Sequence, residues 1–385
     1  MNQIKQNKLT LTGFKRWFTA LILVSVLGLN AMAQVTVTNP GNTTPGLSAT
    51  YTSLANAITA LNAQTAISGP VTISLTAGNP QTAPSGGYAI TAILTGASST
   101  NTVTINGNGN TITAPNPAGT AGNLNDAIFK FIGSDFMTLQ NFVMNENVLN
   151  TTTAAATNNM VEWGVALLYA STTNGAQNIT IQNNTITLNR TYQNTFGIYS
   201  NSTHSATSVA TSATATTAAG ANSGTKIYGN TISNVNNGIL IVGPTGTADA
   251  NTGVDIGGGS ALTGNTISNY GTTATFSGYA NVSGSVYGVY VRNSTGFNIS
   301  YNSISSSNAV SAGTIRAVFI QNASTGVTGT FTNNINNNTI SLQGGAGVNV
   351  DGILVQGTTA TATSSLNINN NNFTNFGFAT TNTNA

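Results

Sequence analysis

A short phrase of polar and apolar residues returns along this chain of 385 residues at nearly constant intervals. It reads GNTISN at 229–234 and again at 264–269, with close copies at 182–187, 300–305, 336–341 and 369–374. Its asparagines are Asn184, Asn230, Asn265, Asn302, Asn338 and Asn371, which gives gaps of 46, 35, 37, 36 and 33 residues. Periods of about 20–50 residues are typical of solenoids, whose repeats must stack because none can bury its own apolar face.

A second set of apolar segments recurs with the same period. The segments are GIYSN at 197–201, GILIVG at 238–243, GVYVRNSTG at 288–296, AVFIQNASTG at 317–326 and GILVQG at 352–357, with GVALLYAST at 164–172 as an earlier member. No helical apolar stripe appears between Ile105 and Phe376. Two aligned strands per period, with equivalent strands about 4.8 Å apart, predict an all-β chain coiled as a parallel β-helix.

Stacking explains why isoleucine and asparagine are the residues that recur. We expect one inward apolar file made of Ile186, Ile232, Ile267, Ile304, Ile340 and finally Phe373. The asparagine two places before each member lies at the bend that precedes the strand. There its amide can accept a hydrogen bond from one neighbouring coil and donate one to the other, and asparagine tolerates the left-handed backbone of a tight corner. The six asparagines are therefore predicted to form a structural ladder.

The first 33 residues have the features of a secretory signal peptide. Four basic side chains up to Arg16 precede the apolar run LILVSVLGL, and Ala31-Met32-Ala33 is a suitable cleavage site. An uncleaved membrane anchor is the alternative, but the run from Leu21 to Leu29 is shorter than the roughly 20 apolar residues that a span needs. We expect cleavage after Ala33, no membrane span afterwards, and a secreted or cell-surface protein.

Charge limits the partners of the exported part. The whole chain has a formal net charge of +2, but residues 34–385 contain five basic and seven acidic side chains, and 5 − 7 = −2. No basic patch remains to bind phosphates, so nucleic acid is not an expected partner. The chain has no cysteine, so its core and backbone ladders must hold it together.

The segment 34–70 is expected to differ from the repeats. VTVTN predicts a first strand, and YTSLANAITALNA at 51–63 places Leu54, Ile58 and Leu61 on one face of a helix that Ser53 can cap. GPVTISLTAGN at 69–79 alternates as a strand does. We therefore divide the exported chain into an N-terminal strand and helix and a β-helix over 71–385.

These segments together resemble the right-handed parallel β-helix of the pectate-lyase-like superfamily. More narrowly, the chain is similar to the secreted Asn/Thr/Gly-rich β-helix proteins that type IX secretion exports to bacterial surfaces. The likeness rests on YTSLANAITALNA, GPVTISLTAGN, TVTINGNGNTIT and the GNTIS series, which span roughly residues 50–375. It implies an N-terminal capping helix near residue 55 and a place on the outer surface of a bacterium. Such proteins end in a compact sorting domain, whereas this chain stops at TTNTNA, so we expect a truncated C-terminus.

The sequence predicts no catalytic residues. Enzymes that cleave glycosides need two carboxyls about 5–9 Å apart, which on a solenoid means acids at equivalent positions of adjacent coils. Asp126, Asp135, Glu146, Glu162 and Asp351 do not align in this way and are expected to be solvated turn charges. His204, the only histidine, lies in a low-complexity stretch and is expected to be exposed.

One segment is a candidate calcium site. In DANTGVD, oxygen-bearing Asp249, Asn251 and Asp255 surround Gly253, and oxygen ligands on a glycine-containing loop suit Ca²⁺. The spacing is shorter than a full calcium loop and no bidentate glutamate follows, so an ordinary Asp/Asn turn is the alternative. No other cofactor is expected.

The second set of segments carries a candidate ligand-binding file. If Val289 and Val291 point inward, Tyr290 and Arg292 point outward. The equivalents of Tyr290 are expected to be Leu168, Tyr199, Leu240, Phe319 and Leu354. Insertions such as 201–225 could cover this file, which would then be buried on both faces. Alternatively it is exposed and binds a sugar or a partner, with Tyr199, Tyr290, Arg292 and Phe319 as contacts.

The sequence favours a non-enzymatic, exported β-helix that acts as a structural or adhesive module and contacts polysaccharide or other cell-surface components. The alternative is a polysaccharide lyase or glycoside hydrolase whose active site lies in a missing or unrecognised part. Ice binding by a flat threonine face is a third possibility, and the unequal spacing of the repeats argues against it.

Overall fold

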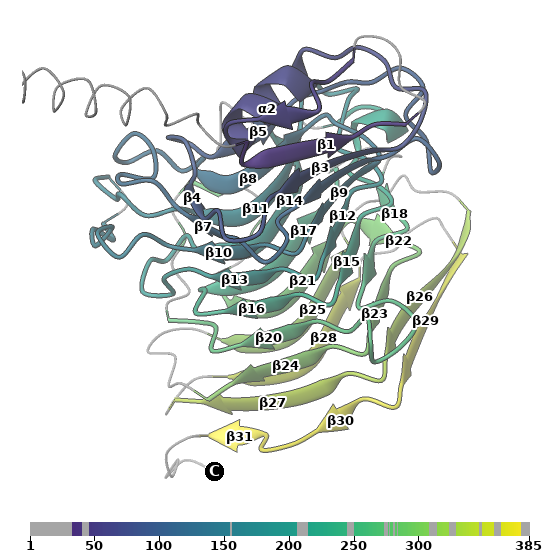
Figure 1. Ribbon diagram of the computed structural model, residues 1–385. Helices are drawn as coiled ribbons and strands as arrows, with labels where there is room; N and C mark the ends of the chain where they lie inside the picture. The colour runs from purple at the N-terminus through teal and green to yellow at the C-terminus, as the bar shows by residue number, and fades with distance from the viewer. Residues whose placement is uncertain are drawn as a thin grey trace, which may run out of the picture.

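The computed structural model describes residues 33–378 apart from short gaps, and it shows a single stack of β-strand coils (Figure 1). The gaps are 41–45, 155, 206–214, 245–249, 273–275, 277, 280–281, 283, 308–313, 323–328, 346–348 and 358–362. The predicted signal peptide lies outside the described residues except for its last position.

Three long sheets run the length of the molecule. The first sheet contains, in spatial order, β2 (Thr50–Tyr51), β1 (Val35–Thr38), β3 (Val71–Leu75), β6 (Val103–Asn106), β9 (Met137–Gln140), β12 (Thr180–Gln182), β15 (Lys226–Tyr228), β19 (Asp255–Ile256), β23 (Asn298–Ser300), β26 (Thr330–Asn336) and β29 (Thr363–Asn369). The second contains β4 (Gln81–Thr82), β7 (Thr111–Thr113), β10 (Val143–Asn145), β13 (Thr185–Thr187), β16 (Thr231–Ser233), β20 (Thr266–Ser268), β24 (Ser303–Ser306), β27 (Thr339–Gly344) and β30 (Asn372–Phe373), and β31 (Gly377–Phe378) also pairs with β27. The third contains β5 (Tyr88–Ile90), β8 (Ala127–Ile132), β11 (Trp163–Tyr169), β14 (Phe196–Ser205), β17 (Asn237–Val242), β21 (Val286–Arg292), β25 (Ile315–Asn322) and β28 (Val350–Gly357).

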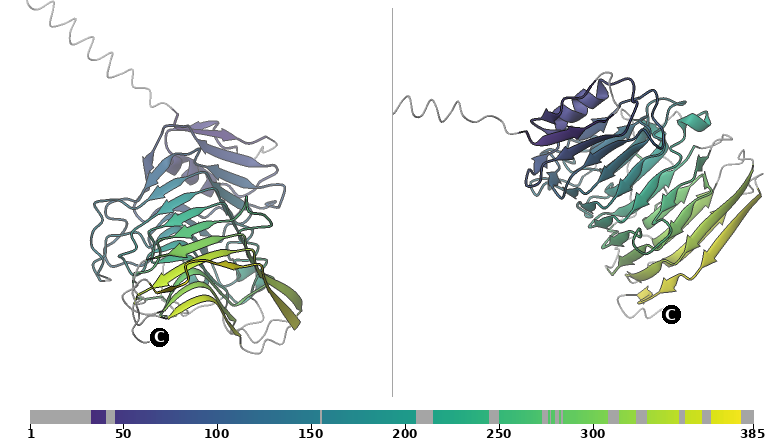
Figure 2. Two further views of the ribbon diagram at one scale, coloured as in Figure 1. Left: turned by 90° about the horizontal axis from the view of Figure 1, so that it is seen from below. Right: turned by 45° about the vertical axis from the view of Figure 1, so that its right-hand side comes forward.

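The chain visits the three sheets in turn and then begins the next coil one strand further along (Figures 1 and 2). From β3 onward the strands of successive coils pair in parallel. The small sheet of β18 (Asn251–Thr252) and β22 (Ser294–Thr295) and the 3-10 turn η1 (Ala218–Gly220) lie in the connections. The predicted parallel β-helix is confirmed. It has three strands per coil, because the recurring phrase follows a first-sheet strand and contains a bend and a separate second-sheet strand.

The expected isoleucine file runs along the inside of the second sheet. Ile186, Ile232, Ile267, Ile304 and Ile340 are each paired with the next member one coil away and have no exposed surface. Phe373 pairs with Ile340 at the end of the file and is 47% exposed. A file of this kind removes apolar surface from water at every coil, which is the main favourable term in the stability of the stack.

The asparagine ladder is also present, and Asn265 shows its geometry. Its Oδ1 accepts from the backbone N of Asn230 (2.9 Å) and from Asn230 Nδ2 (3.0 Å). Its Nδ2 donates to the carbonyl of Ile227 (2.8 Å) and to Asn302 Oδ1 (2.9 Å). The amide-to-amide bond repeats along the whole predicted series, which consists of Asn184, Asn230, Asn265, Asn302, Asn338 and Asn371. Every buried polar atom of these side chains therefore has a partner.

The left-handed corner residue is not the ladder asparagine, contrary to our expectation. Positive φ angles occur one position earlier, at Asn183 (55°), Gly229 (61°), Tyr301 (62°), Asn337 (58°) and Asn370 (55°). The turn is made by that residue, and the ladder asparagine then has its side chain directed into the stack. This explains why asparagine or glycine so often precedes the ladder position in the sequence.

A glycine file faces the isoleucine file from the third sheet. A Cβ at Gly238 would lie 2.7 Å from Cγ2 of Ile267 and 2.3 Å from the carbonyl oxygen of Gly288. Gly164, Gly197, Gly288 and Gly352 meet the inward residue of the second sheet just as closely, while Ala317 is the exception in this file. The glycines that begin the GIYSN and GILIVG segments are thus explained by close packing between two sheets.

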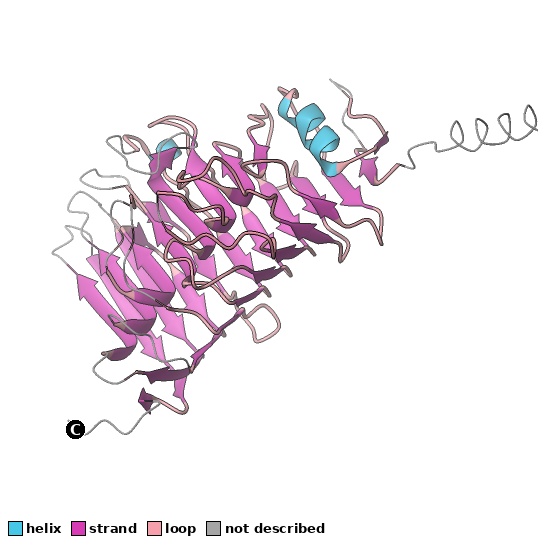
Figure 3. Cartoon of the chain, turned by 90° about the vertical axis from the view of Figure 1, so that its left-hand side faces the viewer, coloured by secondary structure: helices cyan, strands magenta, loops and turns pink. Residues whose placement is uncertain are grey.

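A helix closes the N-terminal end of the stack, as predicted (Figures 1 and 3). Helix α2 (Leu54–Asn62) buries Leu54, Ile58 and Leu61, and Ser53 Oγ accepts from the backbone N of Asn56 at 3.2 Å. Strand β1 pairs antiparallel with β3, so it ends the parallel run of the first sheet. The helix covers the apolar end that would otherwise face water.

We predict that Asn265→Ala lowers the free energy of unfolding by at least about 2 kcal/mol, because it leaves two buried donors of Asn230 and the buried carbonyl of Ile227 without partners. Urea unfolding followed by circular dichroism measures the loss. Thr266→Ala in the same coil alters an exposed side chain and should change stability by less than about 0.5 kcal/mol. Equal effects of the two substitutions would contradict the ladder's role.

Candidate functional site

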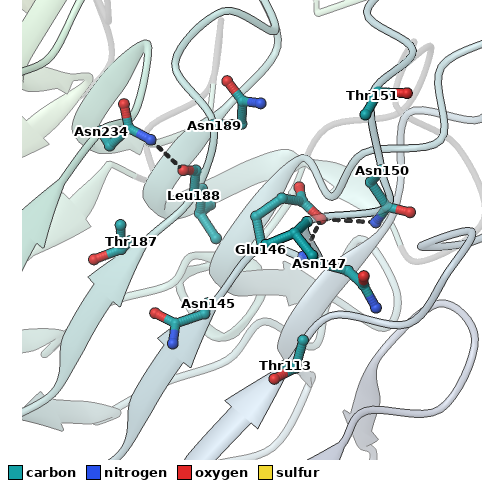
Figure 4. A pocket seen from close by; sticks show the side chains of 11 residues that line it. Thr113, Asn145, Glu146, Asn147, Asn150, Thr151, Thr187, Leu188, Asn189 and Asn234 are labelled. Atoms are coloured by element: carbon teal, nitrogen blue, oxygen red, sulfur yellow. Dashed lines mark hydrogen bonds between the residues drawn. The ribbon is translucent and has the colours of Figure 1, made fainter.

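A groove with a volume of about 640 Å³ lies over the second sheet near the N-terminal end of the stack (Figure 4). Its floor is formed by outward side chains of β7, β10 and β13, namely Thr113, Asn145 and Thr187. The other lining residues are Glu146, Asn147, Val148, Asn150, Thr151, Leu188, Asn189 and Asn234. Segments 146–151 and 188–189 follow directly after β10 and β13, so the groove is built where two strands of the second sheet end.

The residues that line the groove are mostly of polar types, and the lining is almost uncharged. Hydroxyl and amide side chains dominate it, and Glu146 is the only charged residue among the described residues that line it. Val148 is 89% exposed at the edge and adds apolar surface. Concave sites that combine apolar surface with a few well-placed hydrogen-bonding groups bind small molecules and segments of polymers. An uncharged, hydroxyl-rich lining suits a ligand that itself offers many hydroxyl groups.

Glu146 builds the wall of the groove. Its carboxylate accepts from the backbone N of Asn147 (2.9 Å), from Asn150 Nδ2 (2.7 Å) and from the backbone N of Val161 (2.9 Å). Burial raises the pKa of Glu146 to about 7, although these three hydrogen bonds act in the opposite direction. The side chain ties both ends of the segment 146–161 together, and our expectation that it is a solvated turn charge was wrong.

Beyond the groove the second sheet continues as a regular hydroxyl array. Thr231, Thr266, Ser303 and Thr339 are paired in register, each one coil from the next, and all four are exposed. The repeats differ in length because the connections between these strands differ in length, while the strands themselves stay in register. The argument from spacing against a regular threonine face was therefore wrong, and ice binding stays an untested prediction.

Two acidic residues do occupy equivalent positions of adjacent coils, which the sequence reasoning missed. Ala127 pairs with Trp163, so the preceding residues Asp126 and Glu162 are neighbours across the coils. The backbone N of Asp126 donates to Glu162 Oε2 (2.9 Å), and the hydroxyl of Tyr192 donates to Glu162 Oε1 (2.7 Å). The signal that could have found the pair is the alignment of AIFKFI at 127–132 with WGVALL at 163–168.

Burial controls the charge of this acid pair. Desolvation raises the pKa of Asp126 to about 6, with the charge of Lys130 acting in the opposite direction. Desolvation, and then the negative charge of Asp126, raise the pKa of Glu162 well above its ordinary value. Asp126 is 5% exposed and Glu162 is fully buried, so neither was correctly predicted as a solvated charge. In this arrangement the pair fastens two coils to each other, with Tyr192 closing over it.

The other two acids also have structural partners. Asp135 Oδ1 accepts from the backbone N of Gln177 (2.8 Å), and burial raises the pKa of Asp135. Asp351 forms an ion pair with Arg316 at 2.8 Å. Both acids thus contribute to the attachment of one coil to another.

The outward file of the third sheet is buried, so our hypothesis of an exposed binding face was wrong. Tyr199 and Tyr290 have no exposed surface and Phe319 has 1%. The cover includes Phe276 and Tyr279 from the connection between β20 and β21, which favours the alternative of strands buried on both faces. Arg292, at the end of β21, is half-buried.

The register of this file also needs one correction. Tyr290 pairs with Phe319 on one side and with Leu240 on the other, and Tyr199 and Leu354 continue the file as expected. The member in β11 is Ala166, whereas Leu168 pairs with Asn201. The predicted alignment of GVALLYAST was displaced by two residues, because its glycine is followed by a longer apolar run than in the later copies.

His204 lies in β14 and is fully buried, contrary to the expectation of an exposed loop side chain. Its Nδ1 is 2.6 Å from the hydroxyl of Tyr199. Burial lowers the pKa of His204 to about 3, so the ring is neutral at physiological pH. A base for nucleophilic catalysis would need a nearby nucleophile and an open site, and the buried ring offers no access to solvent.

The candidate calcium ligands do not converge in the part of the chain that the structure describes. Asp249 lies outside the described residues. Asn251 is buried, and its Oδ1 accepts from Ser202 Oγ at 3.1 Å. Asp255 uses its carboxylate to accept from Tyr228, from the backbone N of Gly258 and from Asn298 Nδ2. Calcium binding at these three residues remains an untested prediction.

No known protein family matches the chain, and no curated protein is significantly similar in sequence. Among solved structures, the surface protein and adhesin PfbA of Streptococcus pneumoniae is similar over 82% of this chain and 95% of its own, with 10% identity and a TM-score of 0.24. The A-module of the mannuronan C-5 epimerase AlgE6 of Azotobacter vinelandii is similar over 83% of this chain and 95% of its own, with 13% identity and a TM-score of 0.27. Neither similarity is close enough to carry an argument about function.

The described residues contain no helix that is both long and apolar enough to cross a membrane. The only α-helix among them is α2, which has nine residues and packs on the end of the stack.

The buried acid pair predicts a specific pH dependence of stability. Because the pKa of Glu162 is higher in the folded state, the folded protein binds more protons above about pH 4, and its stability falls as the pH rises from there. One such group contributes a slope of up to about 1.4 kcal/mol per pH unit. Glu162→Gln keeps the shape of the protonated acid, so urea midpoints measured from pH 5 to pH 8 should fall less steeply than in the unsubstituted protein. If the slope of the urea midpoint against pH is the same in both proteins, the pH dependence does not come from Glu162.

Proposed function

We propose that this protein is an exported, non-enzymatic β-helix of the cell surface that binds polysaccharide chains in the groove over the second sheet. The observation that carries this proposal is the lining of the groove. The floor offers the hydroxyl and amide groups of Thr113, Asn145 and Thr187. The amide nitrogens of Asn147, Asn150 and Asn234 and the oxygens of the single carboxylate are already bonded within the protein. Sugar hydroxyls can both donate to and accept from such a lining without the burial of a charge.

The shape of the stack supports a polymeric ligand. The floor side chains Thr113, Asn145 and Thr187 are paired in register across three coils, so equivalent groups recur about every 4.8 Å along the solenoid axis. A polymer that runs along the axis meets the same kind of group at each coil. Several weak contacts on one chain add up to useful affinity, as in other multivalent binding.

We predict that the double substitution Asn145→Leu and Thr187→Val weakens polysaccharide binding by about tenfold or more, since each lost hydrogen bond is worth about 0.5–1.5 kcal/mol. Affinity electrophoresis in gels that contain pectin, alginate, chondroitin or a β-glucan measures the change. Thr104→Val is the matched control, because Thr104 also points outward but lies on the first sheet. Equal mobility of the double variant and the control in every gel would count against this site.

A second candidate function is cleavage of a polysaccharide, and the acid pair Asp126 and Glu162 favours it. Two carboxyls on adjacent coils, with Lys130 nearby, are the kind of groups that glycoside cleavage uses. Against this stands their burial and their use in hydrogen bonds between coils. Release of reducing ends or unsaturated products from the same polysaccharides, abolished by Asp126→Asn, would favour the enzyme. Binding without any product favours the adhesive module.

A further inference from the structure

The outer side of the third sheet holds a compact aromatic layer around Trp163. Its rings belong to Trp163, Phe196, Tyr199, His204 and Tyr279, and all five are buried. Trp163 stacks on Tyr199 with ring centroids 4.8 Å apart and planes inclined by 9°. His204 meets the same two rings edge-on, at 5.3 Å from Trp163 and 5.4 Å from Tyr199. Four of the rings come from strands β11 and β14, so the solenoid itself holds them in place.

Three polar atoms in this layer have no hydrogen-bond partner among the described residues. They are Nε1 of Trp163, Nε2 of His204 and the hydroxyl of Tyr279. Trp163 and His204 have no exposed surface, and Tyr279 is 7% exposed. Buried polar atoms are nearly always paired, because an unpaired one loses its bonds to water and gains nothing in return. Three of them in one layer indicate a place made for a ligand.

The hydrogen bonds within the layer determine which of its groups can donate to a ligand. The hydroxyl of Tyr199 accepts from Asn201 Nδ2 at 2.8 Å, and His204 Nδ1, 2.6 Å away, is the only acceptor among the described residues for the proton of that hydroxyl. The ring of His204 is neutral, since burial lowers its pKa to about 3, and its one proton is therefore on Nε2. Nε2 of His204 and Nε1 of Trp163 are thus two unpartnered donors within one aromatic layer. A ligand that binds between these two donors must offer acceptor oxygens.

Tyr279 lies in the middle of this layer but does not belong to strand β11 or β14. It comes from the connection between β20 and β21, and its ring centroid lies 5.0 Å from Phe196, 5.8 Å from Tyr199, 6.1 Å from His204 and 6.4 Å from Trp163. It touches four rings and yet leaves its own hydroxyl unbonded. A six-membered ring that carries hydroxyls and ring oxygen would fill the same space and could also accept from both donors.

We propose that this layer is a second saccharide site, in which the ring of Tyr279 stands where a pyranose ring of the ligand binds. When Tyr279 swings out, the sugar packs its C–H faces against the aromatic rings and its oxygens accept from Trp163 and His204. The charges around the site suit a neutral sugar. Burial raises the pKa of Glu162 beside the layer well above its ordinary value, which disfavours a charge there, and its Oε1 already accepts from the hydroxyl of Tyr192. The site lies on a different sheet from the groove, so a test of saccharide binding at one does not decide binding at the other.

Fluorescence provides a direct test, because the chain has only two tryptophans. Trp17 lies in the predicted signal peptide, so the protein expressed from residue 34 onward has Trp163 as its only tryptophan. In that background we expect cellohexaose, mannohexaose or laminarihexaose to change the emission of Trp163 saturably, and Tyr279→Ala to tighten the apparent affinity at least about tenfold. The gain follows because a site that is open in only a small fraction of molecules binds more weakly by that fraction.

Tyr290→Ala is the matched control, since Tyr290 is an equally buried tyrosine of the same outer face that packs on Tyr287 and Phe319 instead. It should leave the apparent affinity unchanged. The proposal is overturned if no hexasaccharide changes the emission in either protein, or if Tyr290→Ala tightens binding as much as Tyr279→Ala.

A second variant keeps the proposal testable if Tyr279→Ala fails to fold. Tyr279→Phe retains the ring and removes only the hydroxyl. Because that hydroxyl has no partner in the closed layer, the urea midpoint should be equal to or higher than in the unsubstituted protein. A lower midpoint would mean that the hydroxyl is bonded in the closed state, and the argument from unpartnered atoms would then fail.

Discussion

A buried side-chain amide must satisfy all its hydrogen bonds, and in this protein only the coil before and the coil after can supply them. The two donors and the acceptor of each ladder asparagine from Asn184 to Asn338 are used in both directions along the axis. A slip of one residue in any coil would turn its isoleucine outward and leave two ladder amides unpaired. The ladder therefore fixes the register, and the register fixes which residues lie inside, which lie at corners and which face solvent.

The inner files leave the outer faces free to vary, and the groove and the aromatic layer that we propose as saccharide sites lie there. The groove over the second sheet forms where segments after β10 and β13 rise beside the floor, and Glu146 holds one of them in place. The aromatic layer on the third sheet forms where the connection between β20 and β21 returns over β11 and β14. In both places the repeated coil supplies a rigid base, while a non-repeated segment supplies the specific chemistry. The acidic side chains Asp126, Asp135, Glu146, Glu162 and Asp351 fasten one coil or segment to another.

The sequence predicts best where the repeat is strongest. The GNTIS copies give the isoleucine file, the ladder and the parallel stack, because a residue that stacks on its own copy is selected for the same property at every coil. The capping helix is predicted by its own apolar stripe and by Ser53. Prediction is poorer where a copy departs from the pattern. Phe142 occupies the position of the ladder asparagine in its coil, and its backbone N donates to Asn184 Oδ1. Because this coil lacks the recurring phrase, the sequence did not reveal the alignment of residues 127–132 with 163–168 that makes Asp126 and Glu162 neighbours. The burial of Tyr199 and His204 depends on a connection without any repeat, so no periodicity in the sequence predicts it.

The most direct measurement of the stacked register uses the absence of cysteine from the chain. Thr231 and Thr266 point outward from paired positions one coil apart, which places their Cα atoms about 4.8 Å from each other and within reach of a disulfide. The double variant Thr231→Cys and Thr266→Cys should form an intrachain disulfide on mild oxidation, detected as a loss of two titratable thiols in the monomer. The pair Thr231→Cys and Ser303→Cys, two coils apart at about 9.6 Å, should not. Efficient bonding in the second pair, or none in the first, would contradict the stack on which the whole account depends.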